Sequence, residues 1–287
     1  MKLSLLAGAG LLALVSAGAA SAGEVEINDA VARVVVIPEN RSDIDVSVTQ
    51  GSAELPAITV RRRGDDVIVD GHLDRRIRTC RGGEEFVGDP TQMPRGVTVE
   101  VRGHGTIDMA DAPLIIVRTP MNVEVDSDGA VWGAVGRASS VELGAGGCGD
   151  WSVGNTEGAL SVAVGGSGDV RTGTARTLEV AVGGSGDVRT GAVTSADLAI
   201  GGSGDIRIAS VSGPVEVAIG GSGNVTIDGG SAPRLEVAIA GSGEVSFAGE
   251  AGDVDATIAG SGDIRVQRVT GRVERAILGS GDIRIGS

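Results

Sequence analysis

Serine, aspartate and arginine recur together in this sequence, in a tetrapeptide whose residue types could do chemistry. The tetrapeptide is Gly-Ser-Gly-Asp, and in five copies an arginine follows two residues after the aspartate. A serine hydroxyl close to a carboxylate suggests a nucleophile with an acid/base partner. Repeated carboxylates between glycines suggest calcium binding instead. The copies and their Asn and Glu variants begin at residues 166, 184, 202, 221, 241, 260 and 279.

Repetition argues against a catalytic serine. Chemistry needs one residue singled out by its surroundings, whereas these serines are equivalent by position. The sequence after Gly165 also lacks the last glycine of the Gly-x-Ser-x-Gly nucleophile motif. His72 and His104 precede the repeats, and we expect both at the surface. We therefore predict no enzyme activity. A β-helix polysaccharide lyase or hydrolase is the alternative, because paired carboxylates on such a rod can act as acid and base.

Calcium binding is the second alternative. Calcium β-rolls repeat Gly-Gly-x-Gly-x-Asp-x-apolar-x, but here the aspartate comes one residue too early and only once per unit. Stacked aspartates would repel one another, and arginines on the same face would relieve that repulsion. We therefore predict a structural ion-pair ladder and no cofactor, with a calcium-binding β-roll left open. The ladder residues are Asp169, Asp187, Asp205, Asp263, Asp282, Arg171, Arg189, Arg207, Arg265 and Arg284.

Cys80 and Cys148 are the only cysteines in the sequence. Their wide separation matches no zinc-binding spacing. In an oxidising compartment they could form a disulfide, and two separate thiols are the alternative.

The spacing of the repeats predicts the elements that position these residues. Successive copies lie 18 to 20 residues apart, which is too short for a strand, a crossover helix and a second strand, a unit of roughly 30 residues. Segments such as Leu178–Val182 and Val215–Ile219 alternate apolar and polar residues, as strands do. Units that bury their apolar face only against neighbours form a solenoid. We predict an all-β chain in which residues 119–287 form a right-handed parallel β-helix of about 19 residues per coil.

The first 22 residues have the pattern of a secretory signal peptide. Lys2 is followed by an apolar stretch from Leu3 to Ala17, and small residues at Ala20 and Ala22 mark a cleavage site before residue 23. We expect export to the periplasm, the cell surface or the extracellular space.

Residues 23–118 differ from the repeats. They contain alternating stretches and an Arg61-Arg62-Arg63 cluster. Solenoids need a cap that shields an open end, and we predict that this region is a β-rich cap. No window reaches the ~18 apolar residues that a membrane-spanning helix needs.

The amino-acid composition and net charge limit the kinds of partner that the protein is expected to bind. The chain contains 49 Gly in 287 residues and 41% hydrophobic but only 1% aromatic residues, so its core is built from small and β-branched side chains. The formal net charge of −14 argues against binding of nucleic acid or anionic lipid. We expect a non-catalytic cell-envelope or surface scaffold with an envelope, surface or carbohydrate ligand.

The repeated Gly-Ser-Gly-Asp/Asn-Val/Ile turns, after an export signal and early strands, resemble the bacterial family of auto-transporter adhesin head GIN domains. The early strand pattern lies at Ala32–Pro38, Asp45–Val48, Ile58–Val60 and Val67–Val69. The resemblance runs roughly from Glu24 to the end of the chain. It implies a secreted adhesin-like protein and brings no catalytic residues with it.

Overall fold

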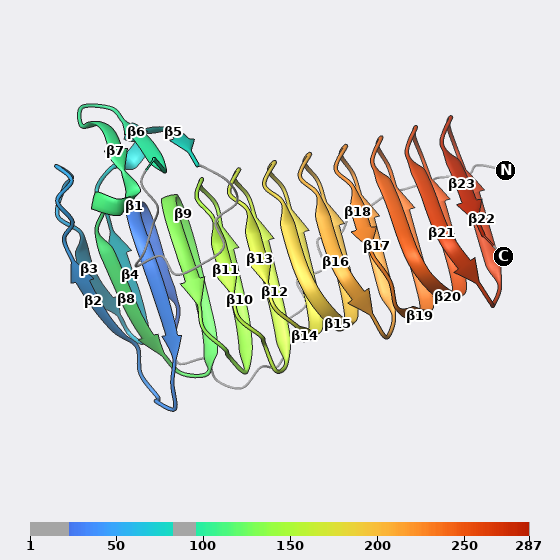
Figure 1. The fold of residues 1–287 in the computed structure, drawn as a ribbon, viewed down its shortest axis with the longest axis horizontal. Coiled ribbons are helices and arrows are strands. Elements are labelled where there is room, and N and C mark those ends of the chain that lie inside the picture. The colour runs from blue at the N-terminus through green and yellow to red at the C-terminus, as the bar shows by residue number, and fades with distance from the viewer. Residues whose placement is uncertain (1–22, 83–95, 287) are drawn as a thin grey trace, which may run out of the picture.

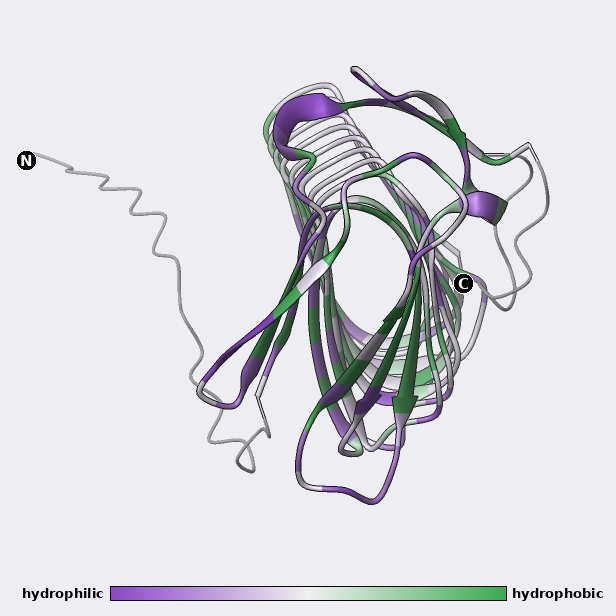
Figure 2. Cartoon of the chain, turned by 90° about the vertical axis from the view of Figure 1, so that its left-hand side faces the viewer, coloured by the Kyte–Doolittle hydropathy of each residue, from purple (hydrophilic) through white to green (hydrophobic). Residues whose placement is uncertain are grey.

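A computed structural model describes residues 23–82 and 96–286. The strands stack into a rod in which each coil lies beside the next (Figure 1). Seen along the rod, the coils lie behind one another around a common interior (Figure 2). The described part of the chain contains no helix that is long and apolar enough to cross a membrane.

From β9 onwards, strands pair in parallel with the strands one coil away, so the predicted parallel β-helix is confirmed. The stacked strands form two parallel sheets, which we call sheet 1 and sheet 2. Three long strands contribute to both of them: β9 (Asn122–Val135), β15 (Val188–Ile200) and β20 (Glu244–Ile258). Sheet 1 also contains β10 (Ser140–Ala145), β12 (Ala159–Val164), β14 (Ala175–Val182), β17 (Val215–Ile219), β19 (Ser231–Ile239) and β22 (Val273–Ile277). Sheet 2 also contains β11 (Trp151–Val153), β13 (Val170–Thr172), β16 (Ile206–Val211), β18 (Val225–Ile227), β21 (Asp263–Val269) and β23 (Asp282–Ile285).

Alternate residues of both sheets point into the rod and form the core. In sheet 1, Val180 lies beside Val162 and Leu198, and all three are buried. The two largest fully buried side chains, Trp151 and Phe247, lie in sheet 2. Each fully buried side chain of this size stabilises the fold by about 1.5–3 kcal/mol, and its neighbours above and below are supplied by adjacent coils.

The strand β1 (Val25–Pro38) belongs to the stack although it precedes the repeats. It runs parallel to β9, from Val25 beside Val125 to Val36 beside Val135. The sequence-based boundary at residue 119 placed this segment in the cap region. The structure instead makes it a coil of the rod, because its alternating valines and alanines continue the inward columns.

Four strands lie beyond β1 at this end of the rod. Parallel to β1 run β4 (Asp66–Asp70) and β8 (Leu114–Thr119). Antiparallel to them run β2 (Asp45–Thr49), which pairs with β8, and β3 (Thr59–Arg63), which pairs with β4. The switch to antiparallel pairing ends the parallel stack, which is how this end is capped.

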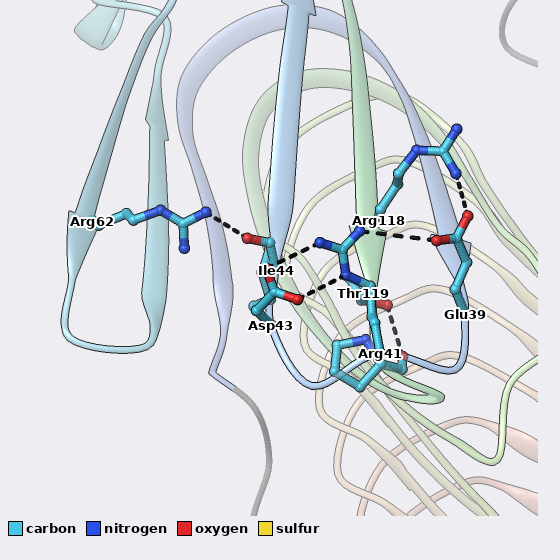
Figure 3. A network of polar contacts seen from close by, with 8 residues as sticks. Glu39, Arg41, Asp43, Ile44, Arg62, Arg118 and Thr119 are labelled. Atoms are coloured by element: carbon cyan, nitrogen blue, oxygen red, sulfur yellow. Dashed lines mark hydrogen bonds and ion pairs between the residues drawn. The ribbon is translucent and has the colours of Figure 1, made fainter.

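Polar contacts hold the turn after β1 against this cap (Figure 3). The carboxylate of Glu39 forms ion pairs with Arg41, at 3.9 Å, and with Arg118 of β8. Arg62 of β3 donates to the carbonyl of Ile44, at 2.5 Å. Two arginines of different strands are therefore tied to one turn.

A small antiparallel sheet packs on the outside of the first coils. It consists of β5 (Ile77–Arg81), β6 (Thr98–Val101) and β7 (Gly105–Asp108), and two 3-10 helices, η1 (Asp74–Arg76) and η3 (Met109–Asp111), flank it. Its own hydrophobic core contains Trp132 of β9. The structure joins Cys80 of β5 to Cys148 in a disulfide with a Cα–Cα distance of 6.1 Å, which ties the small sheet to the rod.

Candidate functional site

The aspartates of the repeats bond mainly to the backbone. The Asp169 carboxylate accepts a hydrogen bond from the N–H of Asp187, at 2.8 Å, and the Asp187 carboxylate accepts one from the N–H of Asp205, at 2.9 Å. The N–H of Asn224 continues the series by donating to Asp205, at 2.8 Å. The sequence predicts arginines as the partners of these carboxylates, whereas in the structure backbone N–H groups also bind them.

The arginines of the repeats follow the predicted pairing in part. Pairs that the structure contains are Asp187–Arg189 at 3.5 Å, Asp263–Arg265 at 3.3 Å and Asp282–Arg284 at 2.9 Å. Arg207 departs from the prediction, because its guanidinium contacts Asp228 at 2.8 Å rather than Asp205. Arg171 lies beside Arg189 in the parallel register. These contacts lie within the turns and the second sheet, and they stabilise both.

A second set of carboxylates forms a continuous column on the outside of sheet 1. Each member lies beside the next in parallel register, from Glu124 beside Glu142 to Asp255 beside Glu274, with Ser161 as the uncharged position. We call this column the acidic face. Its residues are Glu124, Glu142, Ser161, Glu179, Asp197, Glu216, Glu236, Asp255 and Glu274.

Small side chains flank the acidic face. The next outward column consists largely of alanines, at residues 163, 181, 199, 218 and 238. On the other side lie Thr177, Ser195 and Pro214. Because these neighbours are short, the carboxylates of Glu179 and Asp197 stand along a groove of about 340 Å³ that spans several coils.

The charges of the acidic face are mostly uncompensated. Glu236 contacts Arg234 at 3.2 Å, and no other member of the column has an arginine within ion-pair distance among the described residues. Neighbouring carboxylates at a strand spacing of ~4.8 Å repel each other by about 0.9 kcal/mol in a water-like dielectric. At Glu142, burial and then the charges of Glu124, Asp126 and Glu179 raise the pKa of the carboxyl. A cationic group on this face would remove that repulsion.

Sequence reasoning missed the acidic face. It identified the strand pattern of Leu178–Val182 and Val215–Ile219, but it compared only the aspartates that follow the Gly turns. The available signal was the acid at the second position of each such strand, since parallel stacking brings equivalent positions into one column. The exact register, which adds Glu124 and Asp255, needed the structure.

Two carboxyl groups share a hydrogen bond where the acidic face meets the first coil. Burial of Glu24, its hydrogen bond with Asp126 and the charges of Asp126, Glu124 and Glu26 raise the pKa of Glu24 to about 7. Glu24 is therefore partly protonated near neutral pH, and its carboxyl group donates to the Asp126 carboxylate. This proton lowers the negative charge beside Glu124, the first member of the acidic face.

A hydroxyl–imidazole–carboxylate relay lies at the β3–β4 hairpin. Thr59 Oγ1 is 2.9 Å from His72 Nε2, and His72 Nδ1 is 3.2 Å from Asp70 Oδ1. The order of atoms is that of a hydrolytic triad, but a hydrolase also needs an oxyanion hole and a substrate cleft. The N–H groups of Gly71 and Leu73 are already bonded to carbonyls within the protein, and His72 is 46% exposed. The relay links the start of β3 to the end of β4.

Metal binding finds no geometric support in the described ranges. Across residues 23–82 and 96–286, no three His, Cys, Asp or Glu side chains converge into a group that could hold a metal ion. His104 is bonded through Nδ1 to the carbonyl of Glu54, at 2.8 Å. Absence of calcium from the fold remains a prediction.

Comparisons with known proteins agree with this architecture. The crystal structure of a protein described as a putative adhesin from Parabacteroides distasonis ATCC 8503 is 16% identical, with a TM-score of 0.56 and 93% of each chain covered. That of a protein described as a putative lipid binding protein from the same strain is 17% identical, with a TM-score of 0.52 and 92% of each chain covered. At this identity both show a shared fold. The chain matches no curated protein. Residues 198–287 match the family described as "Putative auto-transporter adhesin, head GIN domain", so the resemblance inferred from the repeat is confirmed over this part of the chain.

Proposed function

We propose that this protein is an exported, non-catalytic scaffold that binds cationic groups of an envelope or surface component through its acidic face. The observation that carries the proposal is the column of carboxylates on sheet 1, in which Glu179, Asp197 and Glu216 have no arginine partner within the described ranges. Its members repeat at strand spacing, so a partner with several cations would be held at several points.

The family and the fold support a binding role rather than catalysis. The matched family and one structural neighbour carry the description adhesin, and the other carries the description lipid binding. For this chain, a net charge of −14 and the acidic face disfavour anionic lipid headgroups. We therefore expect the partner's surface to carry exposed ammonium or guanidinium groups.

Binding to a defined polycation tests the proposal. Residues 23–287 would be passed over immobilised polylysine, and we expect retention that falls with added salt, because exposed charges are screened. In the double variant Glu179→Gln/Glu216→Gln, we expect binding to weaken by about tenfold, since each lost contact to a multivalent cation is worth of the order of 0.5–1 kcal/mol.

A matched variant separates the acidic face from net charge. Glu54→Gln/Glu100→Gln removes the same charge from exposed sites outside sheet 1. We expect this variant to bind like the unmodified protein. Equal weakening in both double variants would show that overall charge, and not the acidic face, determines binding.

A further inference from the structure

The two ends of the rod differ. At one end, antiparallel strands β2 and β3 cover the stack. At the other end, in the part of the chain that the structure describes, β22 pairs only with β20 and β23 only with β21 (Figure 1). The same end exposes two large apolar side chains, Ile277 (44%) and Leu278 (75%). An uncovered strand edge is a template for pairing with another strand.

The edge of β22 carries a feature that opposes such pairing. Arg275 continues the inward column of Val217, Val237 and Ala256. A charged residue that points inward on an edge strand disfavours the addition of a further strand. The corresponding inward residue of β23 is Ile283, which continues the column of Val245 and Ile264 and is 6% exposed. Of the two edges, β23 is therefore the one suited to pairing.

The backbone of β23 also has a defined orientation. The N–H of Gly286 donates to the carbonyl of Val266, at 2.9 Å, so residue 286 faces β21. Backbone groups alternate in direction along a strand, so Arg284 and Asp282 face β21 as well. Ile283 and Ile285 consequently direct their N–H and C=O groups to the open edge.

We propose that the protein forms a two-fold symmetric dimer in which β23 pairs antiparallel with β23 of a second copy, centred on Ile283. In this register Ile283 lies opposite Ile283 of the second copy, and the two residues exchange both hydrogen bonds. Asp282 then lies opposite Arg284 of the second copy, and the same contact repeats by symmetry. The inward side chains of the two β23 strands lie on the same face of the joined sheet, so sheet 2 continues from one rod into the other.

Charge selects this register over its neighbours. A shift of two residues in one direction would bring Arg284 opposite Arg284 of the second copy, and a shift in the other direction would bring Asp282 opposite Asp282. Like charges directly opposite each other are destabilising, whereas opposite charges contribute roughly 0.2–1 kcal/mol per pair. Because the interface is the same patch on both copies, it closes at two copies and does not propagate into a filament.

Sedimentation velocity of residues 23–287 tests the dimer. We expect twice the monomer mass, and a dimer that dissociates in Asp282→Lys and in Arg284→Glu, because each change places like charges opposite each other. The combined variant Asp282→Lys/Arg284→Glu again places opposite charges in register, and we expect it to recover the dimer. Circular dichroism of each variant verifies that the rod is folded.

Glu54→Lys is the control, since it reverses an exposed charge that lies outside both the acidic face and the last coil. We expect it to dimerise like the unmodified protein. A monomer at all concentrations, or a dimer that survives both single reversals, would overturn the proposal. The polylysine experiment is independent, because the acidic face is present in monomer and dimer alike.

Discussion

The carboxylate of Asp187 accepts a hydrogen bond from the backbone N–H of Asp205, one coil further along, at 2.9 Å. Asn224 shows that the position does not require a charge. Its N–H and its Nδ2 both donate to Asp205, and its Oδ1 accepts from the N–H of Glu244 at 2.9 Å. The aspartate column is thus a series of side-chain caps for backbone donors at the turns, in which each coil supplies the acceptor for the next.

Substitution of Asp187 by Ala or Asn separates the hydrogen bond from the charge. Asp187→Ala removes the acceptor, and we expect unfolding in urea to show a loss of about 1 kcal/mol. Asp187→Asn keeps an acceptor and removes repulsion from Asp169 and Asp205, so we expect stability equal to or above that of the unmodified protein. If both variants lose the same stability, the carboxylate charge is what matters.

The Gly133→Ala variant probes the packing of the first coils. A Cβ at residue 133 would lie 2.3 Å from the ring of Trp151, which is 1% exposed. The ring must shift, and overpacking of this kind costs about 1–3 kcal/mol. We expect a lower melting temperature and a changed tryptophan emission spectrum. Gly201→Ala is the control, because a Cβ there meets nothing within 4 Å.

Glu24 gives the protein a pH dependence of stability. Its folded-state pKa of about 7 is raised above the ordinary value of 4.5, so the folded state binds the proton more tightly than the unfolded chain does. The resulting stabilisation is complete below about pH 4.5 and is lost as the pH rises to about 7. We expect Glu24→Gln to melt at a higher temperature than the unmodified protein at pH 8 and to remove this part of the pH dependence.

Glu100→Gln serves as the comparison for Glu24→Gln, since this exposed carboxyl lies on β6, outside the Glu24–Asp126 pair. Melting curves recorded from pH 4.5 to pH 8 should differ between the two variants. Parallel curves would contradict the assignment of the pH dependence to Glu24.

The disulfide should stabilise the small outer sheet more than the rod. Cys80 and Cys148 are separated by 68 residues, and closing such a loop stabilises by roughly 4 kcal/mol in the chain-entropy model. We expect Cys80→Ser/Cys148→Ser to lose amide protection in β5, β6 and β7 while β14 to β19 stay protected. Hydrogen exchange read by mass spectrometry measures this, and uniform loss along the rod would contradict it.

Chelation tests the prediction that calcium is not part of the fold. Because Asp187 and Asp205 already bond to backbone donors and Asp263 to Arg265, we expect EDTA to leave the melting temperature unchanged. In a calcium β-roll, removal of the ion would unfold the repeats. A chelator-induced loss of β-sheet signal that calcium restores would refute the prediction.

Much of the fold could be predicted from the sequence because it is periodic. A fixed spacing between Gly turns and the alternation of residues such as Leu178, Val180 and Val182 define coils and inward faces without any knowledge of distant contacts. The resemblance of the repeat to a known family followed from the same pattern. What was predicted well is therefore local, since each coil packs only against its neighbours.

The tertiary structure decided what depends on register and on long-range pairing. It placed β1 between β8 and β9, made backbone N–H groups the partners of Asp169 and Asp187, and joined Cys80 to Cys148. It also aligned the carboxylates of the acidic face, which alternate with apolar residues in sequence and meet only when coils are stacked. A side chain and its neighbour one coil away are separated by 18 to 20 residues of chain. The exact offset of each coil is set by core packing and turn length together, so only the folded rod fixes which charges stand side by side.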